Sequence, residues 1–532
     1  MKSFIYEEIK SVLQQDFILE NPKDRNFAHY ASTIAFSLAK EFKKSPKLIA
    51  EDFAKKFENN EKFEVTSLNG YLNFKLKSSF LNQLITNALN LQENFAKNKT
   101  KSDEKILLEY ISANPTGPLH IGHVRGAVFG DTLQRISNYL GVRMDTEYYI
   151  NDAGNQIDLL GISISLRAKE IFGEKVEYPE KFYRGEYIDE IIPQIQTKFG
   201  KEIFYNESRN LELANFAKDI VLDIIKKDLQ NVGIKIQNYV SEKSLYNEFD
   251  QTVKRLEKSG QMYEKDDKIW IASTKLGDEK DRVVIRDDKR PTYLAGDIVY
   301  HNNKFNRKYN KYINIWGADH HGYIARIKAA INFLGFDEKN LEILLMQMVN
   351  LLKNGEVYKM SKRAGNSILM NDVLNEIGKD ALRFIFISKA ATTPLEFDVD
   401  ELKKEDSTNS IFYINYAYAR INQIFVKANK TFDDVKNADI SKLDNKYFDL
   451  AFEALRLNEI LNEAFTNRAL HKIPDYLKNL ASNFHKFYNE NKIIGTQNEN
   501  EKLKVCAIVA LCIKTAFSLM GLEIKSKMEK QD

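Results

Sequence analysis

Cysteine is nearly absent from this chain of 532 residues, which contains only Cys506 and Cys512. The two are not arranged as Cys-x-x-Cys, so neither a structural zinc site nor a disulfide framework is expected, and a reducing compartment is favoured. An excess of one charge is also lacking, because 78 Lys and Arg residues face 75 Asp and Glu residues and the net charge is only +3. A nucleic-acid partner is therefore neither required nor excluded, and any basic surface must be local.

Long apolar runs are missing as well. No uninterrupted apolar stretch reaches the roughly 18 residues of a membrane span. Residues 1–19 mix Glu, Lys and Gln with apolar residues, unlike the apolar core of a signal peptide. We therefore expect a soluble protein of the cytoplasm with no membrane contact. Its 43% hydrophobic and 29% charged residues are typical of globular proteins, and the length predicts about three or four domains.

Residues 1–100 predict a small α+β domain. Helical patterns are followed by two strands at 63–68 and 71–77, joined by Asn69-Gly70, and both residues of this pair tolerate the positive φ that a hairpin turn needs. The polar stretch 97–104 then predicts a linker.

The region from 101 to 392 has a different pattern, in which apolar strands alternate with helices. An apolar strand at 106–111 leads through a Pro/Gly turn into a helix that Gly141 ends, and a strand at 146–150 follows. Strand, helix and strand in this order predict a βαβ unit and a parallel sheet. The polar, helical stretch from about 158 to 260 indicates an insertion, after which strand-like runs resume at 269–271, 283–285, 313–315 and 344–352.

Beyond residue 393 the chain loses its strand-like runs. Long helical patterns rich in Asn, Lys, Tyr and Phe predict an all-α helix bundle from 393 to 532. Phe412, Tyr416 and Phe484 have the spacing of core residues in such a bundle.

The most informative segment is the first signature, His120-Ile121-Gly122-His123. It stands in a turn between a predicted strand and a helix, where free backbone N–H groups and the helix dipole favour an anion. The two imidazoles, three residues apart, add donors for phosphate oxygens. Gly122 has no Cβ, so a flat ring can approach the backbone.

The second signature is Lys359-Met360-Ser361-Lys362-Arg363, which follows the last predicted strand. Cations in such a loop can close over a triphosphate and stabilise the charge that builds on departing pyrophosphate. The pair predicts ATP-driven activation of a carboxylate.

Both signatures resemble those of class I aminoacyl-tRNA synthetases, and the chain resembles arginyl-tRNA synthetase along nearly its whole length. The segments that carry the resemblance are 109–131, 149–156, 183–187, 317–322, 380–384, 413–420 and 484–488. Asn151-Asp152-Ala153-Gly154-Asn155-Gln156 and Tyr416-Ala417-Tyr418-Ala419-Arg420 are the most specific of them. One departure is Leu68-Asn69-Gly70-Tyr71, which stands where many relatives have Gly-Pro-Gly.

The resemblance implies three functional regions. Residues 1–100 would bind the tRNA elbow, 101–392 would form a Rossmann-like, doubly wound catalytic domain with its insertion at about 158–260, and 393–532 would bind the anticodon. It further implies ATP with bound Mg²⁺ and no zinc, and we expect a monomer that binds tRNA but not DNA.

The resemblance also implies an arginine pocket. Arginine carries five fixed donors, so a selective pocket needs carboxylates. Glu109 and Asp297 would pair with the guanidinium and Tyr293 would flank it, whereas Asn114 would hold the α-amino or carboxylate end. Asp319 and His320 would line the arginine or adenosine side.

The implied chemistry has two steps. Arginine attacks the α-phosphate of ATP, and the 2′-hydroxyl of the terminal adenosine of the tRNA then attacks the arginyl-adenylate. No covalent nucleophile is needed, since His120, His123 and Lys362 position groups and stabilise charge. Lys359, Met360, Ser361 and Gly122 would complete the ATP site. Bound tRNA would be required for arginine activation.

Interleaved aromatic and basic residues in the bundle can stack on bases and hold phosphates. The tRNA-binding candidates are Tyr418, Arg420, Lys486, Tyr488 and, in the C-terminal segment 521–528, Met528.

Three alternatives stay open. The chain could be a class I synthetase for another amino acid or a tRNA-binding relative without catalysis, although a binding-only protein has no need of His120, His123 and Lys362. Asp319-His320-His321 is also found in metal-dependent phosphoesterases, but further Asp/His clusters are missing and the second signature would then have no role.

Overall fold

The computed structural model describes residues 1–22, 27–358 and 368–528. The chain forms two compact units, each taken by itself below. One comprises Met1–Thr100, Glu405–Leu519 and Glu523–Asp532, and the other Lys101–Lys404 with Met520–Leu522. The three-domain division predicted from the sequence is finer than this and stays a prediction.

The N-terminal part of the first unit is a three-stranded antiparallel sheet with helices around it, in the strand order β1-β3-β2. Asn69 and Gly70 have φ of 51° and 87° and connect the register pair Leu68 and Tyr71, as a two-residue hairpin requires. A Cβ on Gly70 would lie 2.8 Å from the Phe36 ring, so the turn also needs glycine for space. The elements are α1 (Lys2–Leu13), β1 (Tyr30–Ser32), α2 (Ile34–Phe42), α3 (Pro46–Lys55), β2 (Phe63–Leu68), β3 (Tyr71–Leu76) and α4 (Ser78–Leu91).

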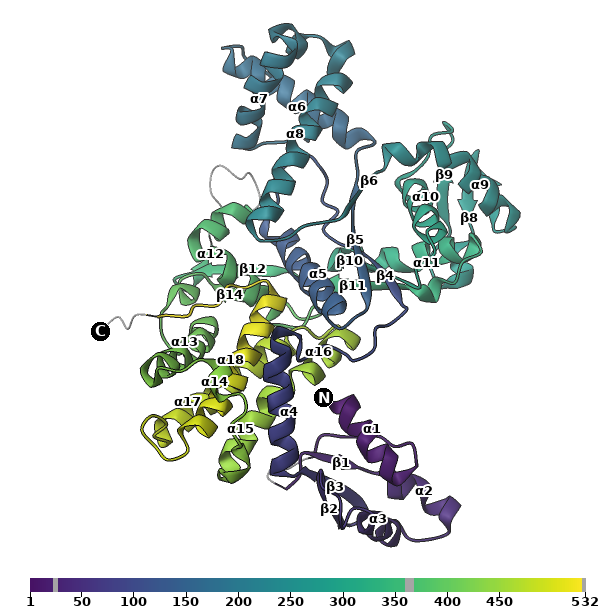
Figure 1. Ribbon diagram of the computed structural model, residues 1–532. Helices are drawn as coiled ribbons and strands as arrows, with labels where there is room; N and C mark the ends of the chain where they lie inside the picture. The colour runs from purple at the N-terminus through teal and green to yellow at the C-terminus, as the bar shows by residue number, and fades with distance from the viewer. Residues whose placement is uncertain (23–26, 359–367, 529–532) are drawn as a thin grey trace. The chain divides into compact units, whose positions relative to one another are not determined.

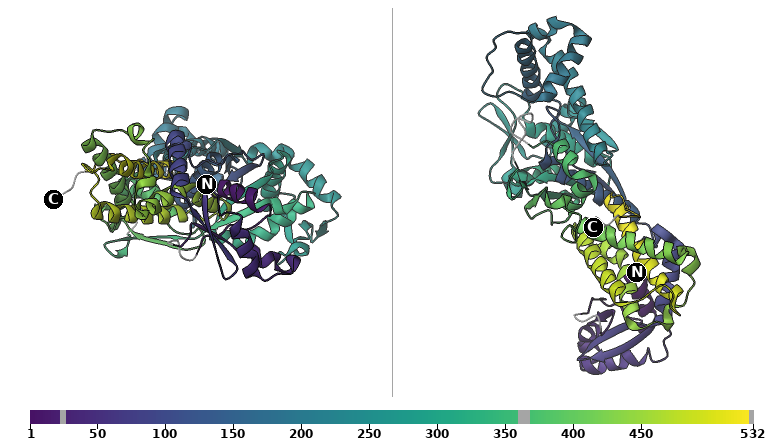
Figure 2. Two further views of the ribbon diagram at one scale, coloured as in Figure 1. Left: turned by 60° about the horizontal axis from the view of Figure 1, so that its bottom comes forward. Right: turned by 90° about the vertical axis from the view of Figure 1, so that its left-hand side faces the viewer.

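The rest of the first unit is an all-α bundle, which confirms the predicted fold of this region (Figures 1 and 2). Its helices are α13 (Ser410–Ala428), α14 (Phe432–Val435), α15 (Asn445–Leu455), α16 (Leu457–Thr466), α17 (Lys472–Glu490) and α18 (Glu499–Met520). Helix α18 is long and apolar enough to cross a membrane, and 89% of its most apolar window is buried in the protein, as in the core helix of a bundle. Cys506 and Cys512 lie in this helix as buried free thiols.

The second unit is built on a five-stranded sheet in the order β11-β10-β4-β5-β6, and every pair in it is parallel. This confirms the parallel sheet predicted from the βαβ unit. Leu107, Tyr312 and Leu341 from three neighbouring strands pack with Ile327 and Ile331 in one buried cluster. The elements are β4 (Lys105–Glu109), α5 (Ile121–Tyr139), β5 (Arg143–Ile150), β6 (Asn238–Ser241), α10 (Tyr293–Asn306), β10 (Lys311–Gly317), α11 (Ile324–Phe333) and β11 (Leu341–Met346).

Further elements surround this sheet (Figure 1). A helical group between β5 and β6 corresponds to the predicted insertion, and two small sheets, β7-β8-β9 and β13-β12-β14, stand apart from the central one. The bounds are α6 (Asn155–Ile171), α7 (Glu186–Phe199), α8 (Asn210–Asn231), α9 (Phe249–Lys258), β7 (Met262–Lys265), β8 (Lys268–Ile271), β9 (Arg282–Ile285), β12 (Val349–Lys353), β13 (Glu356–Val357), α12 (Met370–Ile387) and β14 (Leu395–Asp398).

Two strands differ from the sequence expectation. Strand β6 lies inside the stretch predicted as insertion, and β14 lies beyond residue 393, where no strand was expected. Both are only four residues long; β6 does not alternate, and the alternation of β14 spans the shortest length at which a period of two is informative. Each forms because a neighbouring strand, β5 or β12, offers a parallel edge.

Candidate active site

The first signature lies where the turn after β4 enters α5, as predicted: His120 precedes the helix, and Ile121, Gly122 and His123 form its first turn. His120 is the N-cap residue of α5, and the rings of His120 and His123 stack with centroids 3.5 Å apart. Burial lowers the pKa of His120, and burial together with the neighbouring His120 lowers the pKa of His123 to about 3. Both imidazoles are therefore neutral near pH 7 and offer N–H donors rather than charge. The buried His123 Nδ1 has no partner.

The backbone before this turn is held in an unusual conformation. Ile111 and Ser112 have φ of 74° and 39°, a region that costs non-glycine residues about 1–3 kcal/mol each. Hydrogen bonds of the Ser112 side chain keep it there: Ser112 Oγ donates to Glu109 Oε1 at 2.9 Å and accepts from the Tyr149 backbone N–H at 3.1 Å. The strand end is thus fixed directly ahead of the first signature.

Two backbone hydrogen bonds join the first signature to the segment that follows the second. Ile121 N donates to Ile368 O and Met370 N donates to Leu119 O, both at 2.9 Å, and His120 pairs with Leu369 between them. The second signature itself, Lys359-Met360-Ser361-Lys362-Arg363, lies outside the described residues.

A pocket of about 430 Å³ opens beside α10, within the usual size range of small-molecule sites. Tyr293, Gly296 and Glu242 line it, with Tyr246, Arg286 and Arg290. A Cβ on Gly296 would lie 2.5 Å from Glu242 Oε1, so the absence of a side chain there lets this carboxylate lie against α10.

Two carboxyl groups interact at this place, that of the buried Glu242 and that of the half-buried Asp297. Burial raises the pKa of Asp297 to about 7, with the negative charge of Glu109 adding to the rise and a hydrogen bond from the Tyr323 hydroxyl opposing it. Burial and the negative charges of Asp297 and Asp152 raise the pKa of Glu242 to about 8. Neighbouring carboxylates that repel each other in a poorly hydrated place form a site for a cation.

Glu109 has a different environment from the one expected. Its Oε2 accepts a hydrogen bond from Lys304 Nζ at 2.7 Å, and the same ammonium donates to Asn314 Oδ1 at 2.7 Å. Lys304 is fully buried on α10. The charge of Glu109 is therefore compensated by a direct ion pair, whereas no direct ion pair is formed by Asp297 or Glu242 in the described part of the chain, and the charge of Lys304 only partly offsets the rise in the pKa of Asp297.

The remaining predicted arginine-binding residues lie in exposed positions. Asn114 is exposed in the turn before the first signature, and Asp319 and His320 are exposed after β10, where His320 Nε2 lies 3.5 Å from Asp319 Oδ2. Tyr293 is half exposed and its ring lies 3.6 Å from where a Cβ of Gly154 would be.

Sequence reasoning missed Glu242 and Lys304. Glu242 directly follows β6, and its backbone N–H donates to Ile150 O at 2.9 Å. Residues after the carboxyl end of a parallel strand are typical ligand contacts, so identifying β6 would have pointed to Glu242. Lys304 gave no signal, because its partners are about 10 and 195 residues away in the sequence.

A second pocket, of about 770 Å³, lies in the helical bundle. Three of the predicted tRNA-binding residues line it: Arg420, Tyr488 and Met528, next to Tyr416 and Lys492. The Arg420 guanidinium lies 4.5 Å from the Tyr416 ring centre and 4.8 Å from that of Tyr488.

The other two tRNA-binding candidates lie elsewhere. Tyr418 is buried and Lys486 is exposed, and neither is among the described residues that line this pocket. Tyr416 and Phe412 are only half buried, whereas Phe484 is fully buried in the core as expected.

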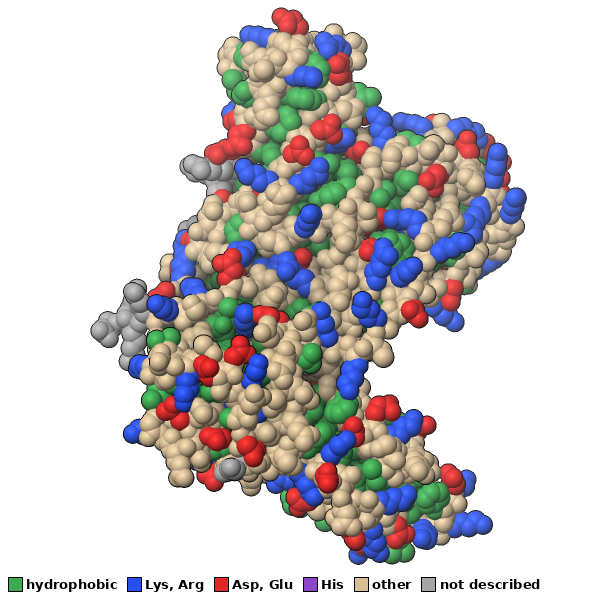
Figure 3. All heavy atoms as spheres, viewed as in Figure 1, with side chains coloured by type: hydrophobic (Ala, Val, Ile, Leu, Met, Phe, Trp, Pro, Cys, Tyr) green, Lys and Arg blue, Asp and Glu red, His purple; other side chains and the backbone are tan. Residues whose placement is uncertain are grey.

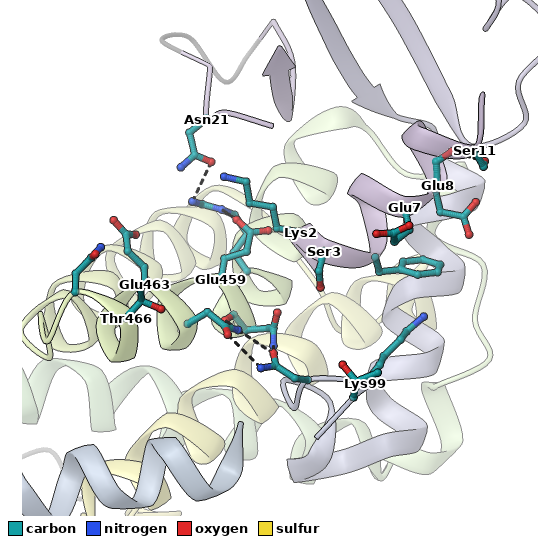
Figure 4. A pocket seen from close by; sticks show the side chains of 17 residues that line it. Lys2, Ser3, Glu7, Glu8, Ser11, Asn21, Lys99, Glu459, Glu463 and Thr466 are labelled. Atoms are coloured by element: carbon teal, nitrogen blue, oxygen red, sulfur yellow. Dashed lines mark hydrogen bonds and ion pairs between the residues drawn. The ribbon is translucent and has the colours of Figure 1, made fainter. Parts of the chain in front are cut away.

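A third and larger pocket, of about 1100 Å³, lies between α1 and α16 (Figure 4). Its charged groups largely compensate one another, as where Arg456 Nε lies 3.4 Å from Glu459 and Lys99 lies over the Phe4 ring. None of the site residues named from the sequence is among the described residues that line it. We therefore do not assign it to the chemistry.

Comparison with known proteins covers the whole chain. Three family models match: the arginyl tRNA synthetase N terminal domain at residues 1–76, the class I tRNA synthetase (R) catalytic domain at 84–427 and the DALR anticodon binding domain at 414–528. An arginine–tRNA ligase from Campylobacter fetus is 66% identical over 530 residues, covering 99% of this chain and 100% of the relative. One from Campylobacter curvus is 64% identical over 529 residues, with the same coverage.

A solved structure shows the same fold. Arginyl-tRNA synthetase from Thermus thermophilus superposes with a TM-score of 0.78 at 20% identity and covers 99% of this chain and 100% of its own. The catalytic-domain model alone spans more than half of the sequence, and the two relatives match from end to end. The chain therefore belongs to the arginyl-tRNA synthetase family.

Proposed function

We propose that the chain attaches arginine to tRNA in two steps at one site in the second unit. Arginine's carboxylate attacks the α-phosphate of ATP to give arginyl-adenylate and pyrophosphate. The 2′-hydroxyl of the terminal adenosine then attacks the carbonyl carbon and releases AMP. Positioning and charge stabilisation supply the catalysis, with no covalent enzyme intermediate.

The observation that carries the choice of arginine is the pair of Asp297 and Glu242. Burial and neighbouring negative charges raise the pKa of both carboxyl groups, and a guanidinium supplies a positive charge together with several donors. In this proposal Asp297 and Glu242 bind the guanidinium from two sides, and Tyr293 flanks it. Glu109, already paired with Lys304, acts as a support for the pocket instead of a direct guanidinium partner.

Asn114 and the first signature complete the substrate site in this proposal. Asn114 holds the α-amino or carboxylate end of arginine from the turn that precedes His120. Asp319 and His320, exposed after the carboxyl end of β10, contribute to the arginine or adenosine side.

ATP binds at the two signatures in this proposal. His120 and His123 donate N–H groups to phosphate oxygens, and the buried, unpartnered Nδ1 of His123 fits that role. Gly122 admits the adenine, and Lys359, Met360, Ser361 and Lys362 close the phosphate side, with Lys362 stabilising the charge on pyrophosphate.

Mg²⁺ is expected to arrive with the nucleotide. Within residues 1–22, 27–358 and 368–528 no three His, Cys, Asp or Glu side chains come together as a metal site. Bound Mg²⁺ would neutralise triphosphate charge, and no step here depends on a metal held by the protein alone. All the proposed protein contacts come from one chain, so we propose a monomer, and membership of a family of translation enzymes is compatible with the cytoplasm.

The tRNA is proposed to bind through the helical bundle, at the pocket of Arg420, Tyr488 and Met528. Aromatic rings and a stacked guanidinium suit unpaired bases of an RNA loop. Lys486 adds a phosphate contact from the exposed face of α17, and Tyr418 supports the bundle from within. Basic and acidic side chains are intermixed on the face shown in Figure 3, and no broad basic field is seen on that face.

Isotope exchange between labelled pyrophosphate and ATP tests the proposal. We expect exchange with arginine only when tRNA is present, and none with lysine or citrulline. Lys362→Ala should slow exchange strongly while the arginine KM is kept. Exchange with another amino acid would overturn the assignment to arginine, and unchanged exchange in the variant would remove Lys362 from the mechanism.

A further inference from the structure

The position of His120 depends on a short antiparallel pairing. Residues 119–121 pair with residues 368–370 through the two backbone hydrogen bonds described above. Two bonds over three residues give little stability by themselves, because an isolated two-stranded pairing is marginal in water. Side chains that contact both segments therefore decide how firmly the pairing holds.

One side-chain pair contacts both segments. Asn371, the second residue of α12, directly follows the paired segment and donates from Nδ2 to Asp228 Oδ1 at 2.6 Å. Asp228 belongs to α8 and is only 3% exposed. The backbone N–H of Leu119 lies close enough to the Asp228 carboxyl group to lower its pKa. The Asp228 carboxyl group thus lies between Leu119, which precedes His120, and Asn371, which follows Met370.

Two acceptor atoms of this pair lack a donor. Asp228 Oδ2 and Asn371 Oδ1 are both buried and have no hydrogen-bond partner. A buried polar atom left without a partner is destabilising, and an ionised carboxylate would leave two such atoms and a buried charge. Rotating the Asn371 amide by 180° would place its Oδ1 against Asp228 Oδ1 and remove the existing hydrogen bond from Nδ2.

A single proton resolves the arrangement. If Oδ2 of Asp228 carries it, the acid can donate to Asn371 Oδ1 while accepting from Asn371 Nδ2, so that each group both donates and accepts. Burial raises the pKa of Asp228, while the hydrogen bond from Asn371, the backbone N–H of Leu119 and the charge of Lys227 oppose the rise. Lys227, on the same helix, is the charged side chain that acts on it in the described part of the chain.

We propose that Asp228 is a positioning residue for adenylate formation, which acts as a protonated acid paired with Asn371 and fixes segments 119–121 and 368–370 against each other. It does not touch substrate; it acts through the backbone that carries His120. The inference rests on the proposed role of His120 in ATP binding. Asp228→Asn retains a neutral group that can donate and accept, whereas Asp228→Ala removes both functions.

Kinetics of ATP–pyrophosphate exchange test the positioning role. Asp228→Ala and Asn371→Ala should lower kcat by about tenfold or more, since small displacements of positioning groups have effects of this size. The arginine KM should stay within about twofold of the wild-type value, because Asp297 and Glu242 are untouched. Asp228→Asn should retain most of the rate. Asp223→Ala is the matched control on the same helix, since Asp223 is exposed and forms an ion pair with the neighbouring Lys226.

Infrared difference spectra give a readout independent of activity. Wild type minus Asp228→Asn should show the C=O band of a protonated carboxylic acid at pH 7, whereas wild type minus Asp223→Asn should show carboxylate bands. Carboxylate bands in the first difference would overturn the protonated pair. If Asp228→Ala fails to fold, the exchange kinetics of Asn371→Ala and the infrared spectra still test the proposal.

Two kinetic outcomes would also overturn the inference: equal losses in Asp228→Asn and Asp228→Ala, or no loss in Asn371→Ala. The proposed role of His120 fails separately, if His120→Ala exchanges normally. That result would leave the infrared assignment of the proton intact.

Discussion

In the proposed site, selectivity for arginine depends on the carboxyl groups of Asp297 and Glu242. We predict that Asp297→Asn and Glu242→Gln each raise the arginine KM about 10–100-fold, the effect of losing about 1.5–3 kcal/mol of charged hydrogen bonding. The ATP KM should change little. Initial rates with each substrate varied in turn measure both values.

Asp319→Asn serves as the comparison for these variants, since Asp319 is exposed after β10. A rise in its arginine KM as large as that of Asp297→Asn would move the guanidinium site toward β10. An ATP KM that rises together with the arginine KM in Asp297→Asn would show a general distortion of the pocket.

The same pair predicts a pH dependence of arginine binding. The pKa of Asp297 is raised to about 7 and that of Glu242 to about 8, so the folded protein keeps protons that the unfolded chain has released. These groups therefore reduce stability progressively as the pH rises from about 4 to 8. A guanidinium favours the ionised carboxylates and reverses this loss. The stabilisation by arginine, measured as the shift of the melting temperature, should grow between pH 6 and 8.5.

The double variant Asp297→Asn, Glu242→Gln is the control for this pH dependence. It should bind arginine weakly and show a melting shift that does not change with pH. A wild-type shift that is flat across the same range would mean that both carboxyl groups are already ionised at pH 6.

Helix α5 depends on close contact with the strand before it. A Cβ on Gly130 would lie 2.6 Å from the ring of the fully buried Tyr110, closer than side chains normally approach. We predict that Gly130→Ala destabilises the protein by about 1–3 kcal/mol despite the better helix propensity of alanine. Thermal unfolding followed by circular dichroism should show a lower midpoint.

Gly322→Ala is the matched control, since nothing lies within 4 Å of the added Cβ and its φ is not positive. It should melt within a degree or so of wild type. An unchanged midpoint in Gly130→Ala would mean that Tyr110 moves aside without cost.

The elements that could be predicted from the sequence are those with a strong local pattern. The β4–α5–β5 unit and the Asn69-Gly70 hairpin follow from apolar periodicity and turn residues, and both are confirmed. Strand β6 is short and polar, and it is stabilised by its neighbour β5, so the sequence alone did not reveal it. Glu242 was missed for the same reason.

The site residues divide in a similar way. His120, Gly122 and His123 could be recognised because their signature is contiguous. The partner of Glu109, Lys304, could not, since the pair is formed only when β4, α10 and β10 come together. The burial of Tyr418 could not be predicted either, because helical periodicity does not distinguish two neighbouring faces when both carry aromatic residues.

Across the whole molecule, substrate activation and tRNA recognition are proposed for different units, so their kinetic effects should separate. We predict that Arg420→Ala and Tyr488→Ala raise the tRNA KM in aminoacylation about 10–100-fold, as expected for the loss of about 1–3 kcal/mol of base stacking. The arginine KM at saturating tRNA should be unchanged.

Lys478→Ala, an exposed position on the same helix α17, is the control for these tRNA-binding variants and should behave as wild type. Equal tRNA KM values in Arg420→Ala and wild type would remove the bundle pocket from recognition. A raised arginine KM in either pocket variant would show that the two units are not kinetically separate.

The buried bond between Lys304 and Glu109 has a consequence for how the chain reaches its native state. The two residues are 195 positions apart, and β4 pairs with β10 in the centre of the sheet. During translation, β4 and β5 therefore emerge long before the strand and the lysine that complete them. Until then, one apolar strand edge stays unpaired and the Glu109 charge has no partner, a state that favours aggregation. Slowing the ribosome between these segments should increase the yield of aggregated chains, and co-expressed chaperones should reduce it.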